Sequence, residues 1–75
     1  MIRRHLTDAP LLNDWRYHPR HDGLGLAGTV TGHPRLPDGT EAITSIIIEI
    51  DEKAGWVRTR NRVYRLGRPA NVVEH

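Results

Sequence analysis

The feature that most constrains the fold is a run of β-branched residues in the middle of the chain. Residues 42–50 read Ala-Ile-Thr-Ser-Ile-Ile-Ile-Glu-Ile, with a β-branched side chain at six of nine positions. Such side chains are stiff at χ1 and pack well on a pleated surface, so the run predicts a strand. Because side chains alternate across a strand, we expect Ile46, Ile48 and Ile50 to face the core. The other isoleucines of the run would then lie on the opposite face.

Further strands are predicted on both sides of this run. Residues 24–31 alternate apolar and small side chains with a period of two, which is typical of a strand with one apolar face. The loop at residues 32–41 contains two prolines and an Asp38-Gly39 pair, which is a turn signal because glycine accepts a positive φ. After the isoleucines, the pattern predicts a hairpin of residues 56–59 and 63–66 and a short last strand at residues 72–73.

The beginning of the chain has a different pattern. Residues 7–15 predict a short helix, because a threonine and an aspartate can cap its free N–H groups and Pro10 suits its first turn. Leu11 and Leu12 lie four and three residues before Trp15, which places all three on one helical face. A helix of this length is marginal alone, so we expect it to lie on the sheet.

The chain of 75 residues is the size of one small domain. Residues 1–23 are predicted to form a helical segment and turn, and residues 24–75 the β part of the same domain. Four to five short antiparallel strands, adjacent in sequence, predict a strongly bent sheet, and closure into a barrel would remove its exposed edges. We therefore expect a mainly β fold, an SH3-like bent barrel with a short N-terminal helix. The alternative is an Sm-like fold, which would imply a ring-shaped oligomer.

The charges are divided sharply along the second half of the chain. Residues 38–52 contain five acidic residues and no basic one, whereas residues 53–68 contain six basic residues and no acidic one. If the two segments are neighbouring strands, opposite charges pair across them, which is worth roughly 0.2–1 kcal/mol per pair. If they are not, the basic segment presents a cationic stripe that can bind phosphates, nucleic-acid bases or an acidic protein surface.

The register of the predicted hairpin decides what the stripe presents. With a two-residue turn, Val57 faces Tyr64 in the core, and Trp56, Arg58 and Arg65 share the outer face. With a turn one residue longer, Trp56, Arg58 and Tyr64 share a face and the outer cluster dissolves, because each slip by one residue reverses the face of a strand. Since the core of so small a domain is short of large side chains, we expect Trp56 to be buried.

Residues able to catalyse a reaction are sparse. The chain has no cysteine, and its one serine, Ser45, lies in the middle of a predicted strand with no base spaced near it. Asp51 and Glu52 are adjacent carboxylates, but acid–base chemistry needs burial to separate their pKa values, and a polar turn does not supply it. A domain of this size also has little room for a substrate pocket. We expect no enzyme activity, no catalytic residue and no cofactor.

Histidines are the remaining candidates for a metal site. His18, His21 and Asp22 are closely spaced, and His33 could supply a third nitrogen. Two of these histidines precede prolines in predicted loops, where ligands do not converge without a supporting fold. We expect turn and surface histidines and no bound metal.

No segment has the pattern of a targeting or membrane-spanning sequence. Two arginines near the N-terminus are not followed by an apolar run, and the longest aliphatic run is the triplet at residues 46–48. A membrane-spanning helix needs about 20 apolar residues. We expect a cytoplasmic protein.

A longer pattern runs through roughly half of the chain, over residues 28–67. Its most specific segments are Gly-His-Pro-Arg-Leu-Pro-Asp-Gly-Thr at residues 32–40, Thr-Ser at residues 44–45, Gly-Trp-Val-Arg-Thr-Arg at residues 55–60 and Val-Tyr-Arg-Leu-Gly at residues 63–67. This resembles a pattern in small uncharacterised proteins of proteobacteria and their prophages, a family that brings no established activity or site residues. The resemblance implies a phage-associated setting, in which short proteins inhibit or regulate by occupying a surface, and anti-CRISPR inhibitors are one instance.

Together these features predict a small binding protein without catalysis that regulates or inhibits a host macromolecule. A protein is the expected partner, ahead of nucleic acid; a homo-oligomer stays open, and no membrane partner is expected. The alternatives are a nucleic-acid-binding module that uses the arginine-rich hairpin and a structural component of a larger complex. With the loop of residues 34–40 beside them, the expected contact residues are Trp56, Arg58, Arg60, Arg62, Tyr64 and Arg65.

Overall fold

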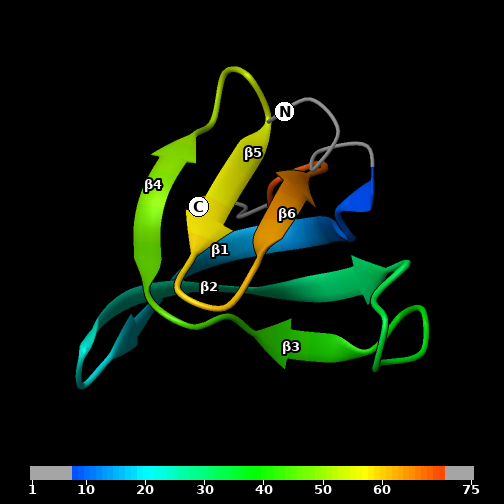
Figure 1. The fold of residues 1–75 in the computed structure, drawn as a ribbon, viewed down its shortest axis with the longest axis horizontal. Helices are drawn as coiled ribbons and strands as arrows, with labels where there is room; N and C mark the ends of the chain where they lie inside the picture. The colour runs from blue at the N-terminus through cyan, green and yellow to red at the C-terminus, as the bar shows by residue number, and fades with distance from the viewer. Residues whose placement is uncertain (1–7, 71–75) are drawn as a thin grey trace, which may run out of the picture.

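The computed structural model describes residues 8–70, which form one curled sheet of six strands (Figure 1). The strands are β1 (Leu11–Arg20), β2 (Gly23–Thr31), β3 (Glu41–Ile43), β4 (Ile47–Asp51), β5 (Trp56–Thr59) and β6 (Val63–Leu66). Their order across the sheet is β3-β2-β1-β6-β5-β4, with β1 and β6 parallel and all other neighbours antiparallel. The prediction of a mainly β fold is therefore confirmed.

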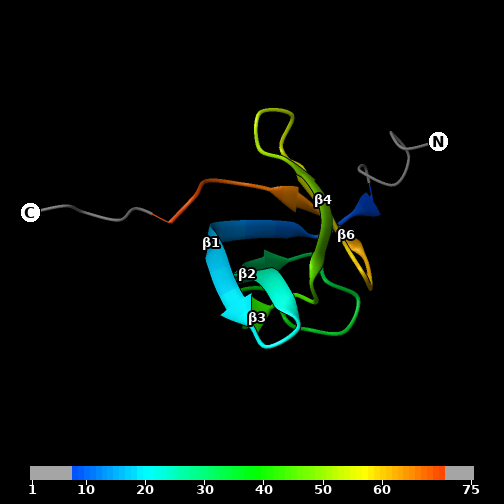
Figure 2. The ribbon, with the colours of Figure 1, turned by 90° about the vertical axis from the view of Figure 1, so that its left-hand side faces the viewer.

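The sheet curls because its two outermost strands are joined by a very short linker. β3 and β4 stand at opposite ends of the strand order, yet only residues 44–46 separate them (Figures 1 and 2). Thr44 is buried at this corner, where its hydroxyl accepts a hydrogen bond from the Leu26 N–H at 3.0 Å and donates one to the Ser45 carbonyl at 2.7 Å. No ladder joins β3 to β4, so the sheet is open.

Several details of the predicted barrel are wrong. Among residues 8–70 the sheet has six strands rather than four or five, one pair is parallel, and the sheet does not close as an SH3-like or Sm-like barrel would. The additional strand arises partly because the predicted strand at residues 42–50 breaks at Thr44, whose buried hydroxyl bonds replace ladder pairing at the corner. The predicted last strand at residues 72–73 lies outside the described residues.

The predicted N-terminal helix is wrong as well, because residues 11–15 belong to β1. Leu12 and Trp15 are both buried although they are three residues apart. A β-bulge explains this spacing: β1 has one more residue than β2 between Asn13 and Arg16, and Asp14 has a φ of 54°. The bulge returns Trp15 to the face of Leu12 and so imitates the spacing of a helix. The predicted cap Thr7 lies outside the described residues.

Glycine is required on β2 opposite this bulge. A Cβ atom at Gly28 would lie 2.7 Å from the Asn13 carbonyl oxygen and 2.9 Å from the Leu12 side chain. β2 can therefore approach the bulged backbone of β1 only with a residue that has no side chain.

A second bulge changes which isoleucines of the run face the core. The register of β4 against β5 shifts between Ile47 and Glu49, so Ile47 and Ile50 both pack against the core. Ile48 points outward and is 49% exposed. The prediction that Ile48 faces the core is wrong, because strict alternation does not hold across a bulge.

The core lies inside the curl of the sheet. Four of the strands supply its buried side chains, and partly buried side chains from β3, β4, β6 and the β2–β3 loop pack against them. The buried members of the cluster are Leu12, Trp15, Leu26, Val30, Val57 and Tyr64. None of the described residues forms a helix long and apolar enough to cross a bilayer.

We expect truncation of a buried and an exposed aliphatic side chain to differ strongly. Leu12→Ala removes a fully buried side chain and should lower the free energy of unfolding by about 2–5 kcal/mol. Ile48→Ala should change it by less than about 0.5 kcal/mol, because this side chain is exposed. Urea denaturation measures both values. Equal losses for the two variants would show that Ile48 is buried in the core and would contradict its outward position.

The β1–β2 ribbon is tied to the turn that follows β4. The hydroxyl of Tyr17 on β1 donates a short hydrogen bond to the Glu52 carboxylate. This bond, with burial and the negative charge of Glu52, raises the pKa of Tyr17 to about 12. Because the folded-state pKa exceeds the ordinary value of 10.0, the contact stabilises the fold fully below pH 10 and is lost as the pH rises toward 12.

We expect Glu52→Gln to lower the pKa of Tyr17 toward 10, because the substitution removes the negative charge beside the phenol. The measurement is the pH dependence of the Tyr17 ring signals in NMR spectra. Glu49→Gln is the matched control, since Glu49 pairs with Arg58 and should leave Tyr17 unchanged. An unaltered Tyr17 pKa in Glu52→Gln would contradict the contact.

Candidate functional site

The β5–β6 hairpin has the register that goes with a two-residue turn. Trp56 is opposite Arg65, and Val57 is opposite Tyr64. The Thr59 N–H donates to the Arg62 carbonyl at 2.9 Å, and this bond closes the turn. Of the two registers that the sequence leaves open, the structure has the one that separates an outer face from a core face.

The predicted contact residues are divided between these two faces. Trp56, Arg58 and Arg65 lie on the outer face, and Trp56 is only partly buried. The expectation that Trp56 is buried is therefore wrong, because its register partner is Arg65 rather than a core residue. Tyr64, in contrast, is 6% exposed and belongs to the core, so its ring is not part of the accessible surface.

Two arginines of the outer face already bind neighbouring groups of the protein. Arg58 forms an ion pair with Glu49 on the neighbouring strand, with 3.3 Å between the guanidinium nitrogen and the carboxylate oxygen. The Nε of Arg65 donates to the Ala9 carbonyl at 2.9 Å. Cross-strand pairing thus accounts for part of the charge division in the sequence, as the first interpretation predicts.

The tip of the hairpin is anchored to the corner between β3 and β4. The N–H of Arg60 donates to the Ile46 carbonyl at 3.0 Å, and the N–H of Asn61 donates to the Ser45 hydroxyl at 3.1 Å. The backbone that carries Arg60 and Arg62 is therefore fixed relative to the sheet.

The loop between β2 and β3, residues 32–40, is stabilised by its own hydrogen bonds. The Nδ1 atom of His33 accepts the N–H groups of Arg35 at 3.0 Å and Leu36 at 3.2 Å. Asp38 accepts the N–H of Gly32 at 2.8 Å, and the Thr40 hydroxyl donates to the Pro37 carbonyl at 2.7 Å. The loop therefore holds the His33 ring in one orientation.

His33, Arg35 and Arg62 form what we call the cationic cluster. The His33 ring lies beside the Tyr64 ring, with 6.3 Å between centroids and 35° between planes. Arg62 lies at the β5–β6 turn, immediately before β6 and two positions before Tyr64. Burial lowers the pKa of His33 below 6.5, and the positive charges of Arg62 and Arg35 lower it further.

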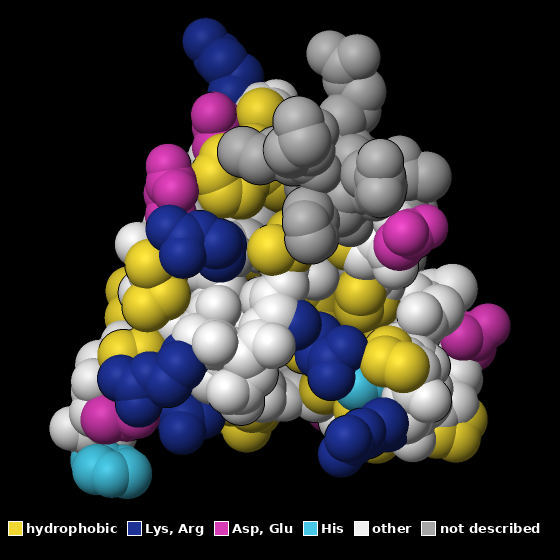
Figure 3. Space-filling view, viewed as in Figure 1, with side chains coloured by type: hydrophobic (Ala, Val, Ile, Leu, Met, Phe, Trp, Pro, Cys, Tyr) yellow, Lys and Arg dark blue, Asp and Glu magenta, His cyan; other side chains and the backbone are white. Residues whose placement is uncertain are grey.

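Among residues 8–70, half of the arginines are paired with carboxylates. These ion pairs join Arg16 to Glu41, Arg20 to Asp22, Arg58 to Glu49 and Arg68 to Asp14. Figure 3 accordingly shows basic side chains in several separate groups rather than in one continuous patch. Of the other described arginines, Arg65 bonds a carbonyl, whereas Arg35, Arg60 and Arg62 lie in the β2–β3 loop and at the β5–β6 turn.

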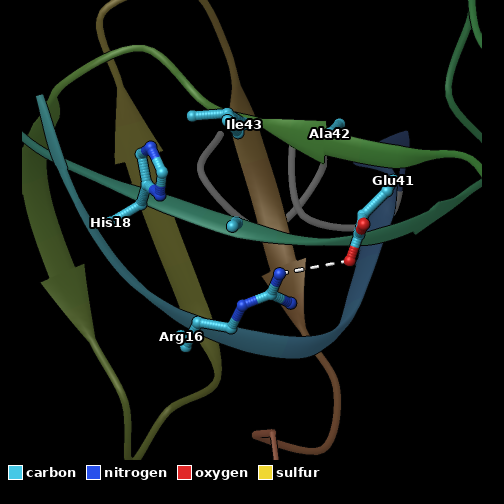
Figure 4. Close-up of a pocket in the computed structure, with 6 residues that line it drawn as sticks. Arg16, His18, Glu41, Ala42 and Ile43 are labelled. Atoms are coloured by element: carbon cyan, nitrogen blue, oxygen red, sulfur yellow. Dashed lines mark hydrogen bonds and ion pairs between the residues drawn. The ribbon is translucent and has the colours of Figure 1, made fainter.

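A hollow lies on the outer face of β1, β2 and β3 (Figure 4). It has a volume of about 190 Å³ and is lined by Arg16, His18, Ala27, Glu41, Ala42 and Ile43. Ligand pockets usually measure about 300–1,000 Å³, and the charged groups here already pair with each other, with 3.1 Å between Arg16 and Glu41. The cationic cluster is therefore the stronger candidate site.

The three described histidines, His18, His21 and His33, do not form a metal site. Within residues 8–70, no three side chains of histidine, aspartate and glutamate are arranged to hold a metal ion. His18 lines the hollow on β1 to β3, whereas His33 belongs to the cationic cluster.

The comparison with known families matches residues 2–75 to a family of unknown function. The chain belongs to the DUF6634 family. No curated protein and no solved structure matches it. Membership extends over the first part of this DUF6634 protein, which the sequence resemblance leaves out, and it assigns no activity to any residue.

The sequence predicts Arg62 as a contact residue and places the loop of residues 34–40, which contains Arg35, beside it, but it does not single out His33 or Arg35. A signal is present, since both flank Pro34 in a turn that we expect beside the hairpin. Their approach to Arg62 depends on the curl of the sheet, which local patterns do not encode.

We expect Arg62→Gln to raise the pKa of His33 partway toward 6.5, because a neighbouring positive charge disfavours the imidazolium form. The rise is partial because burial, the largest cause of the lowered pKa, remains. A pH titration of the His33 ring protons by NMR measures it. Arg58→Gln removes an arginine of the same hairpin that pairs with Glu49, and it should leave His33 unchanged. Equal responses to both substitutions would refute the cluster.

Proposed function

We propose that this DUF6634 protein is a small non-catalytic binding protein that regulates or inhibits a macromolecule by occupying an acidic surface on it. One observation carries the proposal. Arginines at the β2–β3 loop and the β5–β6 turn have no carboxylate partner among residues 8–70, whereas those elsewhere on the sheet are mostly paired. A cation left unpaired on a rigid surface is available to a partner, and complementary charge speeds encounter and fixes orientation.

A protein partner fits this surface better than nucleic acid does. Sequence-tolerant binding of single strands combines a basic groove with exposed aromatic rings on which bases stack. Tyr64 is buried and Trp56 is partly buried on the opposite face of the hairpin. The cationic cluster thus offers charge without a stacking platform. Binding of nucleic acid through the hairpin is the second proposal.

The setting that we propose comes from the sequence pattern at residues 28–67. Its resemblance to small proteins of proteobacteria and their prophages supports a phage-associated role, in which a short protein blocks a host component. Inhibitors of the anti-CRISPR type are one instance of such a protein.

The test compares two variants that each lose three positive charges. In what we call the cluster variant, the two cluster arginines, Arg35 and Arg62, and the neighbouring Arg60 become Gln. In the matched control, the carboxylate-paired Arg16, Arg58 and Arg68 become Gln. Proteins captured from a host lysate by the wild type should also be captured by the control. The cluster variant should retain at most about a tenth of them, since a hydrogen bond to a charged group is worth about 1.5–3 kcal/mol.

Equal capture by both variants would refute the proposed surface. The second proposal is tested separately by titration with single-stranded and duplex DNA and RNA at two salt concentrations. Binding that weakens steeply with salt and is lost in the cluster variant would favour nucleic acid as the partner, because counterion release drives such binding.

A further inference from the structure

The cationic cluster combines three side chains that can donate hydrogen bonds. Because the Nδ1 atom of His33 accepts two backbone N–H groups, at 3.0 and 3.2 Å, its ring proton lies on Nε2, which is a donor. Arg35 and Arg62 each add a planar guanidinium fork whose nitrogens only donate. No described acidic side chain forms an ion pair with either of them.

Neighbouring residues of the core and of the β2–β3 loop also hold the His33 part of the cluster in place. The His33 ring rests beside Tyr64, a core residue that is 6% exposed. The carboxylate of Asp38, the acidic residue of the same loop, accepts the Gly32 N–H at 2.8 Å. Because the backbone hydrogen bonds to Nδ1 fix the His33 ring before a ligand arrives, this donor loses little entropy on binding.

We propose that His33, Arg35 and Arg62 form a binding site for the terminal phosphate of a phosphomonoester. This group is a dianion near neutral pH and presents three unesterified oxygens, which match two guanidinium forks and one imidazole N–H. A carboxylate presents two oxygens, which a single arginine fork already satisfies. A phosphodiester in a nucleic-acid backbone also has only two free oxygens, and among the described residues no exposed tryptophan or tyrosine ring accompanies the cluster to bind its bases.

This inference deepens the proposed function, because it assigns the chemical group that the proposed surface recognises. A partner protein would present such a group as a phosphorylated side chain. A free phosphorylated metabolite would present the same chemistry, and the experiment separates the two sources.

The test is an NMR titration of the full-length protein at pH 7 with inorganic phosphate, O-phosphoserine, a phosphoserine-containing peptide and acetate. Phosphate and O-phosphoserine should shift the His33 and Tyr64 signals saturably, and acetate should bind at least about tenfold more weakly. Arg62→Gln should weaken phosphate binding at least about tenfold, the effect of losing one charged hydrogen bond. Arg58→Gln should have no effect, since it removes a paired arginine from the same hairpin.

Tighter binding of the peptide than of O-phosphoserine supports a protein-borne phosphate, and equal binding supports a small phosphorylated ligand. Binding of acetate as tight as that of phosphate, or equal losses in Arg62→Gln and Arg58→Gln, would overturn the site. The two proposals fail separately. Loss of partner capture in the cluster variant without phosphate binding removes only the phosphate site, and phosphate binding with unchanged capture removes only the proposed function.

Discussion

The sheet depends on the contact between β1 and β6, the first and last strands along the described chain and the two central strands of the sheet. β1 and β6 pair in parallel through only two residue pairs, Leu11 with Arg65 and Leu12 with Leu66. The contact continues along the chain, because the Gly67 N–H donates to the Leu12 carbonyl at 2.8 Å and the Trp15 indole donates to the Gly67 carbonyl at 2.9 Å. Without it, the order β3-β2-β1 and the order β6-β5-β4 would be two separate three-stranded sheets. A single core exists because this short seam brings their apolar faces together.

The seam also explains why residue 67 is glycine. A Cβ atom there would overlap the side chain of Asn13, whose Oδ1 atom accepts the N–H of Arg68 at 3.1 Å. The bulge at Asp14 turns β1 so that the Asp14 N–H donates a hydrogen bond to the Arg68 carbonyl at 2.8 Å. One irregularity in β1 thus serves both the buried Trp15 and the pairing of the two chain segments.

The sequence predicts those elements that local chemistry determines. The β2 strand and the β5–β6 hairpin follow from alternation and turn residues, and both are confirmed. The predicted helix at residues 7–15 and the predicted inward face of Ile48 are wrong for a common reason. Each prediction assumes a regular period, and a bulge at Asp14 or between Ile47 and Glu49 interrupts it. A bulge is defined by the pairing of one strand with its partner, so the sequence of one strand alone does not reveal it.

The candidate site was predictable only in part, again for a physical reason. The alternation of the hairpin correctly separates Arg58 and Arg65 from Tyr64 once the register is known. Whether an arginine is neutralised depends on which strand becomes its neighbour. β4 places Glu49 beside Arg58, whereas the β2–β3 loop places the His33 ring beside Tyr64, two positions after Arg62. Both arrangements follow from the curl of the sheet rather than from spacing along the chain.

An open sheet leaves two edges, and their form has a consequence for self-association. β3 has only three residues, and β4 carries a bulge beside the exposed Ile48. A short edge offers few N–H and C=O groups to a foreign strand, and a bulged edge offers them out of step. Both edges also carry charged side chains, since Glu41 pairs with Arg16 on one side and Glu49 pairs with Arg58 on the other. The chain can therefore remain unclosed without offering a template for edge-to-edge aggregation between its own copies.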